Sequence, residues 1–152
     1  VSIAVASSGQ FQDTGAKRIL LAKDSSANVI SKSIARQGGT SNFRATIEIG
    51  KNADGSKVHE ECDTLILDDY SYSDTIPHNV VNNSSSYLEH EASVSKISED
   101  QLFYLRSRGL SKTQATQRIV MGFLEPFSKE LPMEYAVELN QLIKFDRTDS
   151  IG

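Results

Sequence analysis

The chain has 152 residues, a formal net charge of −4 and a hydrophobic share of 38%. This length suits one domain or a domain with an appendage, and the hydrophobic share is too high for a disordered chain. The acidic balance disfavours nucleic acid as a partner, because proteins that bind nucleic acid present a basic face to phosphate. The sequence holds no apolar run near the ~20 residues of a membrane-spanning helix and no basic leader segment, so we expect a cytoplasmic protein with no membrane partner.

Residues 1–97 have the pattern of β structure. Between Ala45 and Ile49 an apolar residue occupies every second position, as a half-buried strand requires. Clusters of Gly, Asn, Asp and Ser separate the apolar segments and predict turns, and no clear helical period intervenes. The predicted strands are residues 17–22, 28–34, 43–49, 62–67 and 92–97.

Two β architectures fit this pattern, an antiparallel sandwich and a solenoid of short stacked strands. Asp54-Gly55 is the only clear hairpin signal, which a sandwich would need more often. The spacing of the predicted strands shows no strict repeat, which a regular solenoid would show. The residue pattern alone therefore leaves the choice open.

Residues 98–146 have the pattern of three short helices. Ser98 and Gln101 are spaced as a capping box, and Gly109 predicts the end of the first helix. Ser111 and Gln114 form a second box of the same kind ahead of the next helix. The third helix follows a proline, which suits a first helical turn. Its apolar stripe is expected at Tyr135, Ala136, Leu139, Leu142 and Ile143.

Cys62 is the sole cysteine, so the chain cannot form an internal disulfide. The more frequent role of such a residue is that of a small buried hydrophobe. A functional role is also open, because Glu89, His90 and Glu91 supply carboxylate and imidazole donors, and thiolate with these donors suits iron or zinc. On a strand, Glu89 and Glu91 share one face and His90 points to the other.

The single thiol limits what such a site can hold. A stable iron–sulfur centre usually takes four thiolates, so a cluster on this chain would be incompletely ligated, shared with another chain or transient. An exposed polar strand end is the commoner interpretation of a Glu-His-Glu sequence. A cysteine hydrolase triad can be written with Cys62, His90 and Asp63, but no family signature surrounds the cysteine.

Several longer segments together resemble the SufB/SufD family of iron–sulfur cluster assembly proteins. They are residues 11–17, 61–65, 73–77, 88–97 and 101–110. The resemblance extends over nearly the whole chain, and the segments 122–127, 130–138 and 150–152 resemble the SufB branch more than the SufD branch. His78 departs from the family pattern, which has an aromatic residue there. Family members extend much further on the N-terminal side, so we expect a C-terminal fragment of a longer protein.

The resemblance implies a mainly β fold with an α appendage. Residues 1–97 would form the C-terminal portion of a right-handed parallel β-helix, and residues 98–152 a small helical domain. It implies a scaffold, not an enzyme, on which an iron–sulfur cluster is assembled transiently together with a SufD-type paralogue and a SufC-type ABC ATPase. A flavin (FAD) in the full complex is left open. A truncated solenoid exposes strand edges, so the fragment is also expected to form a homodimer.

The resemblance also assigns residues. Cys62 matches the interface cysteine of the family and is the expected ligand of cluster or sulfur. Glu91 matches an interface glutamate and is the expected second metal ligand, with His90 and Glu89 beside it. The helices match the SufC-docking region, where the candidate partner-binding residues are Phe103, Tyr104, Arg106 and Arg108. The alternative function is a SufD-like interaction subunit that recruits the ATPase without ligating a cluster.

Overall fold

A computed structural model describes residues 1–129 and 131–142. Over these residues the chain forms seven strands followed by three helices. Their bounds are β1 (Ser2–Ala6), β2 (Phe11–Leu20), β3 (Ser26–Ala35), β4 (Thr40–Ile49), β5 (Lys57–Ile66), β6 (Tyr72–Val81), β7 (Tyr87–Lys96), α1 (Glu99–Ser107), α2 (Lys112–Ser128) and α3 (Met133–Leu142). The strands belong to a compact unit, Val1–Lys96, and the helices to a second one, Ile97–Gly152.

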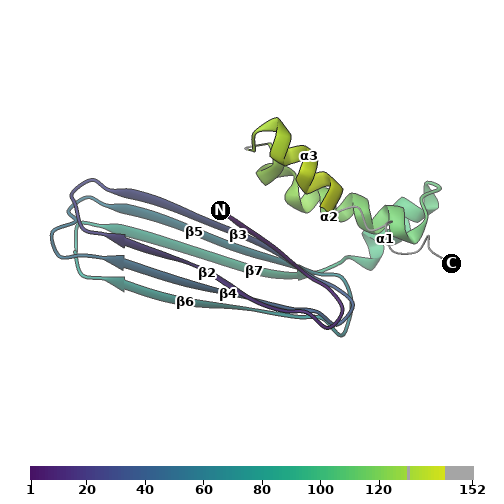
Figure 1. The fold of residues 1–152 in the computed structure, drawn as a ribbon, viewed down its shortest axis with the longest axis horizontal. Helices are drawn as coiled ribbons and strands as arrows, with labels where there is room; N and C mark the ends of the chain where they lie inside the picture. The colour runs from purple at the N-terminus through teal and green to yellow at the C-terminus, as the bar shows by residue number, and fades with distance from the viewer. Residues whose placement is uncertain (130, 143–152) are drawn as a thin grey trace. The chain divides into compact units, whose positions relative to one another are not determined.

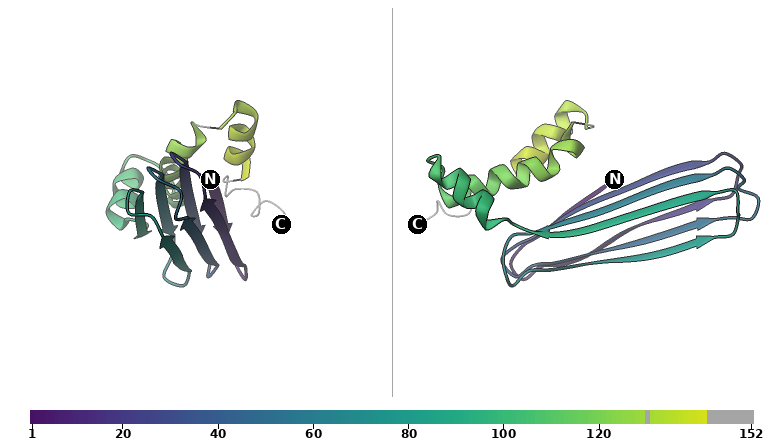
Figure 2. Two further views of the ribbon diagram at one scale, coloured as in Figure 1. Left: turned by 90° about the vertical axis from the view of Figure 1, so that its left-hand side faces the viewer. Right: turned by 180° about the vertical axis from the view of Figure 1, so that it is seen from behind.

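The strands form two parallel sheets that face each other (Figure 1). One sheet has the order β1-β3-β5-β7 and the other the order β2-β4-β6, and the neighbouring strands in both are parallel. Successive strands therefore alternate between the sheets, and the chain winds as a solenoid of three coils with β7 beginning the next. Figure 2 shows the two layers from behind. The predicted parallel β-helix followed by helices is confirmed, and the antiparallel sandwich is excluded.

Alternate side chains of each strand point into the space between the two sheets. The inner residues of β4 are buried without exception: Ser41, Phe43, Ala45, Ile47 and Ile49. The four apolar ones form one core with residues of the neighbouring strands and of one turn: Leu20, Val29, Ala53, Val58 and Cys62. Removing this apolar surface from water, at about 25 cal/mol per Å², is what holds the two sheets together.

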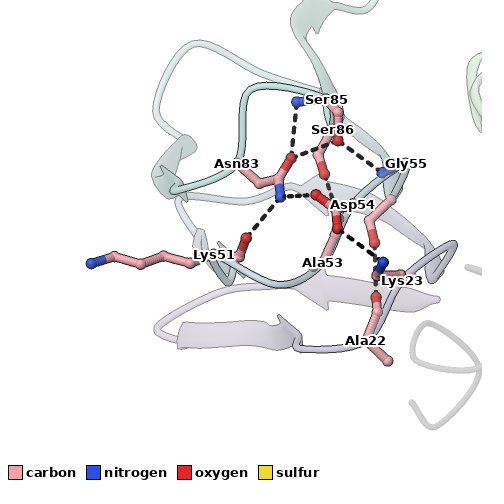
Figure 3. Close-up of polar contacts among 10 residues, drawn as sticks. Ala22, Lys23, Lys51, Ala53, Asp54, Gly55, Asn83, Ser85 and Ser86 are labelled. Carbon is pink, nitrogen blue, oxygen red and sulfur yellow. Dashed lines mark hydrogen bonds and ion pairs between the residues drawn. The ribbon is translucent and has the colours of Figure 1, made fainter.

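The turns between strands stack on one another and are joined by side-chain hydrogen bonds (Figure 3). The amide of Asn83 donates to the backbone oxygen of Lys51 and to a carboxylate oxygen of Asp54, both at 2.8 Å. The side-chain oxygen of Asn83 in turn accepts from the backbone and hydroxyl of Ser85. That hydroxyl oxygen accepts the backbone N–H of Gly55 at 3.1 Å. The Asn-rich segment after β6 thus ties one coil to the coil before it.

The strands are longer than the sequence pattern predicts. The five predicted segments overlap β2, β3, β4, β5 and β7, while β1 and β6 lie outside the predicted set. Four of the five inner positions of β6 carry polar residues or proline, so β6 shows no apolar alternation: Ser73, Thr75, Pro77 and Asn79. The fifth is Val81, which is 45% exposed. Backbone pairing with β4, and the hydroxyl of Ser73 donating to the Ser41 carbonyl at 2.6 Å, hold this strand in place instead.

The first two helices begin where the capping boxes predict. The Ser98 hydroxyl accepts the backbone N–H of Gln101 ahead of α1. Ser111 and Gln114 form the full reciprocal box ahead of α2. Gly109, just after α1, has a φ of 92°, a left-handed conformation that favours glycine.

The third helix starts directly after Pro132, as predicted. On its predicted stripe, Ala136 and Leu139 are half-buried, whereas Tyr135 is 60% exposed. The side chain of Leu142, the residue Ile143 and the segment 150–152 lie outside the part of the chain that the structure describes. None of the helices in the described ranges is long and apolar enough to cross a membrane.

Candidate functional site

Glu60, Cys62 and His90 meet inside the solenoid. They occupy inner positions of β5 and β7, whose register places Glu60 beside His90. The Cys62 Sγ lies 3.7 Å from Oε1 of Glu60, and Nε2 of His90 lies 3.8 Å from the same oxygen. One carboxylate oxygen, the sulfur and one imidazole nitrogen all lie within 4.8 Å of one another. Among the described residues, this is the one group of three such side chains close enough to hold a metal ion.

This group is enclosed by the coil. Glu60 is 0% exposed and Cys62 is 2% exposed, while the His90 side chain is 23% exposed. From the opposite sheet, the Asn79 amide donates to the second oxygen of Glu60 at 3.3 Å. The Nε2 atom of His90 is buried and makes no hydrogen bond within the described residues. The site therefore contains a carboxylate removed from water and an imidazole nitrogen whose hydrogen-bonding capacity is unused.

Burial and the adjacent charge of Glu60 raise the pKa of Cys62 to about 12. At neutral pH the free side chain is accordingly a thiol, which donates its proton toward Glu60. A buried thiol of this kind is a weak nucleophile, because the thiolate is the reactive form. A bound metal changes this, since it deprotonates a coordinating thiol outright.

Glu89 and Glu91 lie on the opposite face of β7 from His90, as the strand alternation predicts. The carboxylate of Glu89 lies 3.3 Å from Nδ1 of His59. Glu91 stands in register with Glu61, whose carboxylate lies 3.8 Å from Nε2 of His59. The structure thus brings Cys62 and His90 together inside the solenoid. It places Glu89 and Glu91 outside, among the outward side chains of β5.

Lys32 organises the acidic side chains of this outer face. Its ammonium group binds the carboxylates of Glu61 and Asp63, and its side chain is only 9% exposed. Burial tends to lower the pKa of Lys32, but the hydrogen bonds and charges of the two carboxylates outweigh it and raise that pKa. Asp63 also accepts from the Ser93 hydroxyl on this face. The hydrolase triad with Asp63 is therefore not assembled, because Asp63 faces away from the interior that holds Cys62 and His90.

Glu60 is absent from the residues predicted for the site. The predicted strand begins at Cys62, so the prediction assigns no face to the residues before it. The signal was nevertheless present, because extending the alternation backwards puts Val58, Glu60 and Cys62 on one side of the strand. An acidic residue between two apolar ones on the same face is the pattern that could have identified it.

The four residues predicted to bind a partner lie in and just after α1, and all four are exposed: Phe103, Tyr104, Arg106 and Arg108. The Arg108 guanidinium lies over the Tyr104 ring at 5.1 Å from its centre. Phe103 is 75% exposed, which is unusual for a large apolar side chain. Phe103 and Arg106 also line a hollow of about 550 Å³ that extends to Ser111 at the start of α2.

A family model described as "SUF system FeS cluster assembly, SufBD core domain" matches residues 1–123. This match covers most of the chain, including every strand and the thiol–carboxylate–imidazole group. The chain therefore belongs to the SufBD core family, a family of iron–sulfur cluster assembly proteins.

Individual relatives agree with this assignment. The chain is 58% identical over all of its 152 residues to the iron–sulfur cluster assembly protein SufB of Bacillus subtilis. It is 59% identical over the same length to an iron–sulfur cluster assembly SufBD family protein of Staphylococcus epidermidis. In both comparisons the chain spans 33% of the relative's length.

Proposed function

We propose that this chain is part of a scaffold on which iron–sulfur clusters are assembled, with Cys62 as the residue that takes up sulfur or ligates the nascent cluster. The scaffold is non-catalytic: it binds iron and sulfide as cargo and releases them as a cluster. The family assignment supports the cluster-assembly role.

The observation that carries this proposal is the position of Cys62. It is the only thiol of the chain, and it lies beside a carboxylate and an imidazole in the interior of the solenoid. One thiolate with oxygen and nitrogen donors ligates a cluster incompletely, because durable centres use four thiolates, or two thiolates on one iron and two imidazoles on the other. Incomplete ligation suits a cluster that must later leave.

We infer that the outward carboxylates of Glu89 and Glu91 also bind iron for cluster assembly, on the outer face of the solenoid. Glu91 and Glu89 are hard oxygen donors that can hold ferrous iron before it meets sulfide. Because both face outward, away from Cys62, we place this iron at an interface with a second subunit and not in the interior trio. A SufD-type paralogue is the partner proposed for that interface, and a second copy of this chain is the substitute when the paralogue is absent.

We assign the helical unit to the partner that supplies energy. Exposed aromatic side chains beside exposed arginines are typical of the few residues that dominate a protein interface. Phe103 and Tyr104 with Arg106 and Arg108 have this composition, and the hollow beside them offers space for a side chain of the partner. The proposed partner is a SufC-type ABC ATPase.

The test is anaerobic reconstitution with ferrous iron and sulfide in the presence of both partners. Cys62→Ser should abolish the cluster absorbance, because a hydroxyl lacks the softness that iron–sulfur chemistry requires. Asp13→Asn, a change in an exposed strand residue far from the site in sequence, is the matched control and should leave the yield unchanged. A normal cluster yield from Cys62→Ser would refute the assignment. ATPase binding without any Cys62-dependent cluster would favour the SufD-like interaction subunit.

A further inference from the structure

The interior of a solenoid normally holds apolar side chains, and Glu60 is a marked exception. It is 0% exposed, and it lies in the same inner row as Val58 and Cys62. A buried carboxylate is costly unless it is paired or coordinates a metal. The partners recorded for Glu60 are an amide, a thiol and an imidazole, and none of these carries a permanent positive charge.

The spacing of the three donor atoms fits one small metal ion. Bonds of about 2.0 to 2.3 Å in a tetrahedral arrangement place neighbouring ligand atoms about 3.3 to 3.8 Å apart. The Cys62 sulfur is 3.7 Å and the His90 nitrogen 3.8 Å from the shared oxygen of Glu60. A sub-ångström adjustment of side chains is enough to close this group around an ion.

The state of His90 is an independent observation that points to a ligand. Its Nε2 atom is buried, faces the Glu60 carboxylate and forms no hydrogen bond in the described part of the chain. Neutral imidazole nitrogen is the commonest protein ligand of transition metals. The Asn79 amide holds the other oxygen of Glu60, as the hydrogen-bonded carboxylates of metal sites are held by their surroundings.

We propose that Glu60, Cys62 and His90 form a site for a single divalent transition metal ion within one chain, without sulfide and without a second subunit. Carboxylate, thiolate and imidazole together select iron(II) or zinc over calcium or magnesium, which take oxygen ligands. Binding releases the Cys62 proton to solvent, and the thiolate and carboxylate then balance both charges of the ion. Three protein ligands leave a fourth position for water or for an incoming sulfur atom.

This site uses the same interior group that we propose beside the nascent cluster, but it needs neither sulfide nor the outer carboxylates Glu89 and Glu91. It rests on the geometry of one chain, so it stands or falls separately from cluster assembly. If both hold, the mononuclear ion is the state of the scaffold before sulfur arrives.

The test uses cobalt(II) alone, added anaerobically to the full chain without sulfide or partners. Cobalt(II) reports tetrahedral thiolate coordination by visible bands and a sulfur-to-metal charge-transfer band, and zinc should displace it. We expect one ion per chain. Cys62→Ser should remove the charge-transfer band, and Glu60→Gln and His90→Gln should each weaken binding by about tenfold or more.

Glu48→Gln is the matched control, because it removes a carboxylate from the outward face of β4, in the opposite sheet. It should leave cobalt affinity within about twofold of the parent chain. Circular dichroism verifies that each variant is folded, and His90→Gln provides the decisive comparison if Glu60→Gln does not fold. Absence of stoichiometric cobalt binding, or equal losses in Glu60→Gln and Glu48→Gln, would overturn the proposal.

The outcomes also separate the two proposals. A chain that forms a Cys62-dependent cluster with its partners but binds no cobalt contradicts the mononuclear site alone. A chain that binds cobalt through the three ligands but forms no cluster contradicts the scaffold function alone.

Discussion

Asp68 shows how single polar residues fix the shape of this solenoid. It lies in the turn between β5 and β6 and accepts the backbone N–H groups of Tyr70 and Ser71, the Ser71 hydroxyl and the backbone N–H of Gln37. Partial burial acts to raise the pKa of this carboxyl, but the donors outweigh it and hold the pKa below its usual value. The charged form is therefore the one that the folded chain prefers.

Asp68→Ala should lower the free energy of unfolding by about 1–3 kcal/mol near neutral pH, because it leaves several donors of the turn without their acceptor. A folded-state pKa below the unfolded one gives stability that is present above the unfolded pKa and is lost as pH falls through the folded value. The difference between the parent chain and Asp68→Ala should accordingly shrink below the usual aspartate pKa of 3.8. Urea unfolding at a series of pH values measures it.

The neighbouring residue provides the control for this prediction. Asp69 forms an ion pair with Lys96 in which both side chains are largely exposed. Such pairs are worth about 0–1 kcal/mol, so Asp69→Ala should cost little. Equal losses for the two alanine variants, or a loss at Asp68 that does not change with pH, would contradict the role assigned to Asp68.

Single residues also show how much of the candidate site could be predicted from the sequence. The lone cysteine and the Glu-His-Glu triplet can be identified directly in the sequence. Strand alternation correctly separates His90 from its two neighbours. Alternation extended backwards from Cys62 places Glu60 on the inner face, but its position beside His90 depends on strand pairing between residues 30 positions apart. No local pattern contains that pairing.

At the scale of elements, the strands differ in how far their sequence predicts them. β4 has five inner residues that are buried and mostly apolar, so the alternation of inward apolar and outward polar residues can be recognised in its sequence. β6 has polar inner residues and depends on hydrogen bonds with β4, so its sequence resembles that of a loop. The capped helices α1 and α2 depend on local signals at their first residues, which is why the predicted starts are correct.

Alanine substitutions at Gly39 and Gly122 should have opposite effects on stability. A methyl group on Gly39 would meet the carbonyl carbon of Ala6 and the oxygen of Ser7 at 2.6 Å, and backbone atoms cannot move aside cheaply. A methyl group on Gly122, inside α2, would meet nothing within 4 Å. Gly39→Ala should destabilise by about 1–3 kcal/mol, whereas Gly122→Ala should stabilise its helix by about 0.5–1 kcal/mol.

Thermal unfolding followed by circular dichroism measures both changes, at a wavelength for strands in the first case and for helix in the second. The opposite signs make the comparison its own control. A Gly39→Ala variant as stable as the parent chain would mean that the close approach at Gly39 is not a constraint on the fold, and a destabilised Gly122→Ala variant would contradict the expected gain in helix stability.

At the scale of the whole molecule, the chain divides into two compact units. The group of Glu60, Cys62 and His90 belongs to the solenoid unit, and the exposed aromatic and arginine residues of α1 belong to the helical unit. Chemistry and partner recruitment should therefore be separable by mutation. The homodimer expected from exposed strand edges stays a prediction.

Arg106→Glu should weaken binding of a SufC-type ATPase by about tenfold or more, because charge reversal at an interface arginine both removes an attraction and adds a repulsion. Isothermal calorimetry with the purified ATPase measures the affinity. Cobalt binding at Cys62 should remain unchanged in the same variant. Arg118→Glu, an exposed arginine in α2, is the matched control. If the two reversals had the same effect, or if neither had one, the docking role of α1 would be refuted.

The position of β7 at the edge of its sheet has a consequence for the residence time of a bound ion. β5 is hydrogen-bonded to β3 on one side and to β7 on the other, whereas β7 pairs with β5 alone among the described strands. Edge strands open locally more often than central ones, so amide hydrogens of β7 should exchange with solvent sooner than those of β5. Each opening would carry His90 away while Glu60 and Cys62 stay in place. An ion at the proposed site would then leave or change ligands at the frequency of strand fraying, without the chain ever unfolding.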